Sequence, residues 1–441
     1  MNLFGKIKYK LKKINFFELG ISAALCYLMI FFLAPALSFF GISVNKFYYP
    51  SAVSAKPLLY ILLGFVFLLI GYFNGFPKKI SDKIPNIFEK EWHFKKVFIF
   101  FCVVFLLNIF IKGLLFLAGI YHHTEQSSFV NNPFYSTIGF LSWSGPLALM
   151  IAFISYFHFK KIGEEKYKLW RILAWGSLAL EIIYFLPSCG RIGVVIPIVS
   201  YLIIKFYMDK PDYKDLSLII MVIILFLFPF ANICKNFQIV NVNMNTGMSS
   251  ILFIDSNANQ IGIFDFPHYI KISFLDRIDQ YKIFSKLIST PEISGDYGLK
   301  SLVKNFLIPL GPPRFIWKNK PITSGDGNNF GHQIGILSSV DLKTSIGPTI
   351  VGDWYLNFGI IGIAAGMFFM GFLWRFIYEY LIGSRSRIFL SALLIYGVFW
   401  IQIIHGMENR ITPVYSGLVK MCVALIVIHF LISKSFKIKS S

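Results

Sequence analysis

Charged side chains are scarce in this chain. Asp, Glu, Lys and Arg make up 15% of its 441 residues, whereas hydrophobic residues make up 56%. Soluble domains are about a quarter charged and about half apolar, so this composition argues against a soluble protein. Apolar stretches of about 17–25 residues recur along the chain. The sequence therefore predicts an all-α polytopic membrane protein.

Motifs of metal and nucleotide chemistry are missing. The five cysteines show no metal-ligand spacing. The chain has no DxD or HExxH motif, no phosphate-binding glycine loop and no GxSxG. These absences argue against a metal-dependent transferase, an ATPase and a serine hydrolase. We expect neither a metal nor a cofactor.

Acidic residues are few, and the net charge is +20. The basic residues cluster in short segments between apolar stretches, which is typical of membrane orientation and not of nucleic-acid binding. If the N-terminus is cytoplasmic, 25 Lys and Arg residues fall inside and four fall in short outer loops. This asymmetry predicts cytoplasmic termini.

The apolar pattern predicts about ten transmembrane helices and one long interruption. Residues 1–233 hold seven helices, 234–349 form a large external loop, and 350–441 hold three more helices. The expected ranges are 17–42, 57–76, 97–120, 136–157, 169–187, 192–208, 217–233, 350–378, 388–404 and 414–432.

Short helices are expected within the loop. Ser273 to Asp276 reads as a capping box, and Thr290-Pro291 would end the helix that follows it. A second helix is expected from Leu299 to Ile308, before a Pro/Gly turn that presents Arg314. After the loop, Gly359, Gly362 and Gly366 fall on one face of the expected helix 350–378 and predict close helix packing.

External arginines are the first candidates for chemistry. A guanidinium binds phosphate through paired hydrogen bonds and keeps its charge. Four arginines would suit a lipid pyrophosphate, although each could instead be an interfacial anchor or a salt-bridge partner: Arg191, Arg277, Arg314 and Arg410.

Charges within the apolar segments form a second set. Such charges tend to face a cavity or each other. We expect a cluster of Lys112, Glu181 and Lys420, with snorkelling of the lysines to the surface as the alternative. The acid–base candidates are Asp353, which could instead stabilise a helix dipole, and His332 in a polar turn, together with His405 and Glu408.

Several segments resemble Wzy-type oligosaccharide repeat-unit polymerases. Gly352-Asp353-Trp354-Tyr355-Leu356-Asn357-Phe358-Gly359 resembles the segment after the large loop of that family. Pro312-Pro313-Arg314-Phe315-Ile316-Trp317-Lys318-Asn319-Lys320-Pro321 resembles its PR-x-x-W-x-x-KP segment, and Ser188-Cys189-Gly190-Arg191 its SGSRG-like turn. Phe274 to Arg277 and Tyr297-Gly298 recur in order within the loop. The family often has Glu at Asp353 and Ser at Cys189.

The resemblance implies polymerisation of undecaprenyl-pyrophosphate-linked oligosaccharide repeat units at the periplasmic face of the bacterial inner membrane. A chain-length regulator and a flippase would be partners beside the lipids. The pyrophosphate would meet the four arginines, and Asp353 or His332 would be the base. The remaining substrate contacts would come from Lys320, Trp317, Tyr355, His405 and Glu408. The alternatives are an O-antigen ligase and a lipid-linked oligosaccharide flippase, which should show paired repeats.

Overall fold

The computed structural model describes residues 15–39, 55–117, 141–185, 191–209, 279–290, 293–295, 297–312, 316–321, 327–338, 341, 344–383 and 388–433. Within these ranges the chain is helical and forms no β-strand beyond an isolated bridge between Trp92 and Ser433. In the described part of the chain, five helical stretches are long and apolar enough to cross a membrane: Leu19–Leu37, Ala55–Lys83, Phe94–Leu115, Thr349–Gly383 and Ile411–Ile432. The predicted class of membrane protein is confirmed at this level. The count of ten spans and the external loop stay predictions, and the expected span 217–233 lies outside the described residues.

The helices follow the apolar segments of the sequence closely. They are α2 (Leu19–Phe39), α3 (Ala55–Phe73), α5 (Phe94–Leu117), α8 (Ser144–Ile162), α9 (Tyr167–Phe185), α10 (Arg191–Met208), α18 (Thr349–Tyr378), α19 (Leu390–Gly406) and α20 (Ile411–Ile432). The end of α8 lies beyond the predicted residue 157. Two lysines, Lys160 and Lys161, continue that helix until Gly163 ends it with a left-handed φ of +73°.

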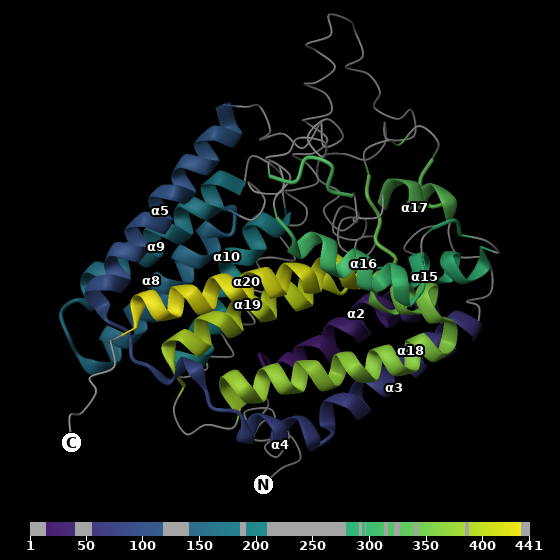
Figure 1. Ribbon diagram of the computed structural model, residues 1–441, viewed down its shortest axis with the longest axis horizontal. Coiled ribbons are helices and arrows are strands. Elements are labelled where there is room, and N and C mark those ends of the chain that lie inside the picture. Colours follow the sequence, from purple (N-terminus) through teal and green to yellow (C-terminus); the bar gives the residue numbers. More distant parts are fainter. Residues whose placement is uncertain are drawn as a thin grey trace, which may run out of the picture.

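The helices pack as an antiparallel bundle in which α5, α8, α9 and α10 form one side and α3, α4 (Phe76–Lys83) and α18 the other (Figure 1). The middle of α8 is buried all round, from Ala148 to Ile154, as expected for a central helix. We call the end that holds the first turns of α18 and α20 the loop end. The opposite end holds most of the described lysines, and we call it the lysine end.

Glycines bring the backbones of α3 and α18 into contact. A Cβ at Gly71 would lie 2.1 Å from the carbonyl oxygen of Phe368, and one at Gly371 would lie 2.1 Å from that of Leu68. Small residues permit such an approach in a membrane bundle. At the lysine end, Arg375 of α18 holds Glu18 at 2.9 Å. These contacts fix α18 against the first two helices.

A break divides α18 at Gly359, which adopts φ +63° and ψ −147°. The side chain of Trp354 folds back onto the second half of the helix. A Cβ at Gly366 would lie 2.1 Å from the Trp354 ring, and one at Gly362 would lie 2.4 Å from its carbonyl oxygen. The prediction that Gly359, Gly362 and Gly366 share one packing face of a continuous helix is therefore wrong. Gly359 allows the bend, and the other two make room for a tryptophan of the same helix.

Three short helices cover the loop end (Figure 1). They are α15 (Gln280–Ser289), α16 (Leu299–Leu310) and α17 (Gly327–Gln333). Thr290 ends α15 as predicted, and Asp279 caps its start by accepting from the backbone N–H of Lys282. The expected capping box at Ser273 lies outside the described residues. Leu287, Phe330 and Ile334 join α15 and α17 in a small apolar core.

Candidate functional site

A cavity of about 300 Å³ opens at the loop end. Three parts of the chain line it: the first residue of α17, the segment 345–348, and the end of α19 with the start of α20. Its polar side chains are Ser345, Gln402, His405, Asn409 and Arg410. Two of the predicted site residues, His405 and Arg410, therefore meet in one cavity.

The backbone of the returning chain is attached to the turn between α19 and α20. The N–H of Ile350 donates to the carbonyl of Met407 at 3.0 Å. A Cβ at Gly347 would lie 2.4 Å from the carbonyl oxygen of Glu408, so this position admits only glycine without a shift. Thr349 adopts a left-handed φ of +67°, which is strained for a β-branched residue. The cavity wall is thus formed by two chain segments held in close contact.

Asp353 anchors the start of α20. Its side chain is 3% exposed, and its Oδ2 accepts a hydrogen bond from the backbone N–H of Ile411 at 2.8 Å. Ile411 is the first residue of α20, so the carboxylate satisfies one of the free N–H groups of that helix. The structure thus shows Asp353 in the alternative role, in which it stabilises a helix terminus. The stabilised terminus is that of α20.

Arg410 directly precedes α20 and faces Tyr297 of the loop. Its Cζ lies 5.9 Å from the centre of the Tyr297 ring, within range of a cation–π interaction. Burial raises the pKa of Tyr297 above its ordinary value, and the charge and hydrogen bond of Arg410 lower it in part. The phenol therefore stays neutral at physiological pH and can donate a hydrogen bond. Tyr297 joins the covering loop to the cavity wall.

Asn357 connects the loop to the helix that carries Asp353. Its Oδ1 accepts from the backbone N–H of Gly298 at 3.0 Å, and its Nδ2 donates to the carbonyl of Asp353 at 2.7 Å. Gly298 has φ +93° and precedes α16, so the amide of Asn357 fixes the point at which α16 begins. The segment Asp353 to Asn357 thus holds both α16 and α20.

Lys320 closes the turn that follows α16. Its ammonium donates to the carbonyls of Pro309, Gly311 and Pro312 at 3.2, 3.0 and 2.9 Å. A lysine has three donors, and these bonds satisfy carbonyls at the end of the helix. Trp317, which is 39% exposed, lies beneath the same ammonium at 5.8 Å. Both residues therefore stabilise the turn at the end of α16.

The remaining predicted residues are dispersed. Tyr355 packs between Tyr60 and Phe284, with ring centres 5.9 and 6.2 Å away. His332 lies in α17, not in the predicted polar turn, and it does not line the cavity. Glu408 lies half-buried in the turn between α19 and α20. Arg277 and Arg314 lie outside the described residues, and of Arg191 only its place at the start of α10 is described.

A buried ion pair joins α5 to α9. Glu181 is 1% exposed, and its Oε1 accepts hydrogen bonds from Lys112 and from Asn108, the latter at 2.7 Å. Gly145 of α8 packs against the carboxylate. Two members of the predicted intramembrane cluster therefore meet. Lys420 on α20 takes no part in the hydrogen bonds described for this pair.

Residues 324–429 match a family model described as "Putative O-antigen polymerase". The matched region runs from just before α17 into the last turn of α20 and contains every residue that lines the loop-end cavity. This part of the chain is similar to O-antigen polymerases. The resemblance predicted from the sequence is confirmed. No curated protein matches the chain, and no solved structure matches it.

Sequence reasoning missed the polar residues that neighbour Arg410. Gln402 and Asn409 line the cavity, and Tyr297 faces the guanidinium. Tyr297-Gly298 was visible as part of the resemblance, but its position against Arg410 depends on how the loop folds. Among the described residues, no group of three or more His, Cys, Asp or Glu could hold a metal ion.

Proposed function

We propose that this protein is an O-antigen polymerase that elongates an undecaprenyl-pyrophosphate-linked glycan at the loop-end cavity, on the periplasmic face of the inner membrane. One observation carries the proposal: the whole lining of that cavity falls within the region that matches the polymerase family. The lysine-rich opposite end supports this orientation, because cytoplasmic segments carry the excess of Lys and Arg.

Arg410 is proposed to bind the pyrophosphate of the donor. Its side chain is half-buried at the cavity, and the Tyr297 ring lies 5.9 Å from its Cζ. A guanidinium presents paired donors to phosphate oxygens and stabilises the charge that grows on a leaving pyrophosphate. Arg191, Arg277 and Arg314 are proposed to join it when substrate binds.

The reaction needs a base for the acceptor hydroxyl. The hydroxyl oxygen of the acceptor sugar attacks the anomeric carbon of the donor. The bond from that carbon to the pyrophosphate oxygen breaks, undecaprenyl pyrophosphate leaves, and the hydroxyl proton passes to the base. Asp353 and His332 remain candidates. Among the acid–base candidates we favour His405, because its exposed side chain lines the cavity, whereas Asp353 already accepts a hydrogen bond from Ile411.

The test uses purified protein in vesicles with lipid-linked repeat units. The wild type should produce a ladder of chain lengths without a nucleotide sugar. Arg410→Ala should reduce elongation by about 10²-fold, the effect of removing one donor to a developing anion. Arg410→Lys should recover only part of it, because lysine lacks the planar fork.

Arg171→Ala is the matched control, since Arg171 is an exposed arginine of α9 near its lysine end. Its ladder should equal that of the wild type. A product that stops after one transfer, or a requirement for a lipid A acceptor, would replace the polymerase proposal with that of a ligase.

A further inference from the structure

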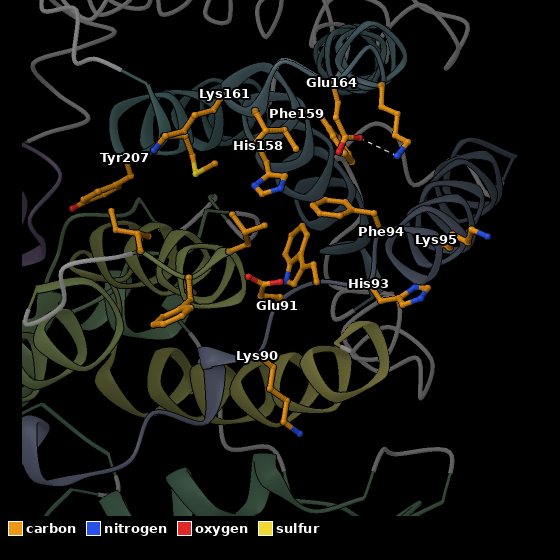
Figure 2. A pocket seen from close by; sticks show the side chains of 17 residues that line it. Lys90, Glu91, His93, Phe94, Lys95, His158, Phe159, Lys161, Glu164 and Tyr207 are labelled. Carbon is orange, nitrogen blue, oxygen red and sulfur yellow. Dashed lines mark hydrogen bonds and ion pairs between the residues drawn. The ribbon is translucent and has the colours of Figure 1, made fainter. Parts of the chain in front are cut away.

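A second, larger cavity of about 980 Å³ lies at the lysine end (Figure 2). It is bounded by residues 90–95, by the last turns of α8 and α10, and by the first turn of α19. Leu390 of α19 lines this cavity, and Gly406 of the same helix lines the loop-end cavity. Sixteen residues of helix span about 24 Å, which approaches the roughly 30 Å of a bilayer core. The two cavities therefore lie near opposite membrane boundaries.

Basic groups outnumber acidic groups around this cavity. Its lining includes four lysines and two histidines but two glutamates: Lys90, Lys95, Lys161, Lys166, His93, His158, Glu91 and Glu164. Lys166 pairs with Glu164 at 2.9 Å (Figure 2), which leaves Glu91 as the other carboxylate of the lining. In the same view the His158 ring turns inward, whereas Lys95 points outward. Positive charge is thus arranged around the rim.

The inner wall of the cavity is apolar. Phe94 stacks on His158 with ring centres 4.9 Å apart and contacts Phe159 at 4.5 Å. The wall continues with Met208, Phe389 and Leu390. A cavity with a cationic rim and an apolar wall suits an amphiphile that has an anionic head and hydrocarbon beneath it.

The segment that forms the rim is held rigidly. Trp92 is 2% exposed, and its indole N–H donates to Ser391 at 2.6 Å. The backbone N–H of His93 donates to the carbonyl of Ile432 at 2.8 Å. These bonds fix the segment to α19 and α20, so the cavity is formed before any ligand binds. A preformed site loses less conformational entropy on binding.

We propose that the lysine-end cavity binds the headgroup of an anionic phospholipid. The phosphodiester lies between Lys161 and His158, and the first carbons of the acyl chains lie along Phe94 and Leu390. Basic pockets between helices at the cytoplasmic boundary are the places where anionic headgroups bind. A bound lipid touches α5, α8, α10 and α19 together and stabilises their packing. This site is separate from the loop-end cavity and does not depend on the reaction proposed there.

The experiment measures thermal unfolding of the full chain in vesicles of phosphatidylcholine, with and without phosphatidylglycerol. Phosphatidylglycerol should raise the unfolding temperature of the wild type, because a ligand that binds only the folded state stabilises it. The double variant His158→Gln/Lys161→Gln should lose most of that shift, because it removes the two groups that flank the phosphodiester. Glu91→Gln should enlarge it, since one carboxylate leaves the lining.

Lys78→Gln/Lys79→Gln is the matched control, because both lysines are exposed on α4 and neither lines the cavity. It should keep the wild-type shift. An equal loss in this control would show general surface attraction and overturn the proposal. A wild type that does not respond, or a double variant that responds fully, would also overturn it. Inorganic phosphate at the same concentration should give no shift, and a shift equal to that of the lipid would assign the site to free phosphate.

Discussion

The Oδ2 atom of Asp353 lies 2.8 Å from the backbone nitrogen of Ile411, and this hydrogen bond joins the first turn of α18 to the first turn of α20. Residue 411 follows Arg410 directly. The carboxylate therefore fixes the helix start on which the guanidinium is carried. Substitutions of Asp353 can therefore distinguish a role in positioning Arg410 from a role as the acid–base group.

Asp353→Asn should keep the fold and most of the elongation activity, because the amide oxygen can still accept from Ile411. Asp353→Ala should lower the free energy of unfolding by about 0.5–2 kcal/mol, the cost of losing a helix cap. Unfolding in detergent and the ladder assay measure the two effects. A stable Asn variant without elongation would instead make Asp353 the base.

Lys320→Met should loosen the turn after α16, because the carbonyls of Pro309, Gly311 and Pro312 lose their charged donor. Limited proteolysis should then cut between residues 311 and 320 several times faster than in the wild type. Lys300→Met is the control, since Lys300 is exposed in the first turn of α16. Equal cutting of both variants would contradict the role of Lys320 in closing this turn.

Lys112→Met should destabilise the bundle by about 3–5 kcal/mol, because it leaves the Glu181 carboxylate buried without its partner. The double variant Lys112→Met/Glu181→Leu should cost less than the single one. Lys160→Gln is the comparison, since its pair with Asp209 is exposed and worth at most about 1 kcal/mol. Additive losses in the double variant would argue against a coupled pair.

Gly359→Ala should destabilise the protein by about 1–3 kcal/mol, because the backbone there lies close to a glycine-only conformation. Gly366→Ala should also destabilise it, since a methyl group would collide with the Trp354 ring. Gly113→Ala on α5 meets nothing within 4 Å and should be neutral or stabilising. Thermal unfolding of the three variants tests this order, and similar values for all three would reject the break in α18.

The sequence predicted the helices well because membrane segments are selected for length and apolarity. The expected range 192–208 differs from α10 by one residue, and Leu299 was placed correctly as the start of α16. The family was also predicted, from short motifs in a fixed order. Pro309 was expected to end α16, but it lies inside the last turn of that helix. Lys320 donates to the carbonyls of Pro309 and Gly311 at this helix end.

The geometry of the site could not be predicted in the same way. Asp353 is 58 residues from Ile411, and Asn357 is 59 residues from Gly298. Such pairs depend on which helix ends meet, and hydropathy does not specify that. The spacing of Gly359, Gly362 and Gly366 gave a wrong prediction for a related reason. Helical spacing assumes a straight helix, and the bend at Gly359 turns Gly362 and Gly366 toward Trp354.

The bend in α18 also alters the electric field of the bundle. A helix carries a partial positive charge of about half an elementary charge at its N-terminus. The second half of α18 runs from the break towards Arg375 at the lysine end, so its own N-terminus faces the loop end. The N-terminus of α20 faces the same way. Two aligned dipoles thus direct their positive ends towards the loop end without an additional ionised side chain.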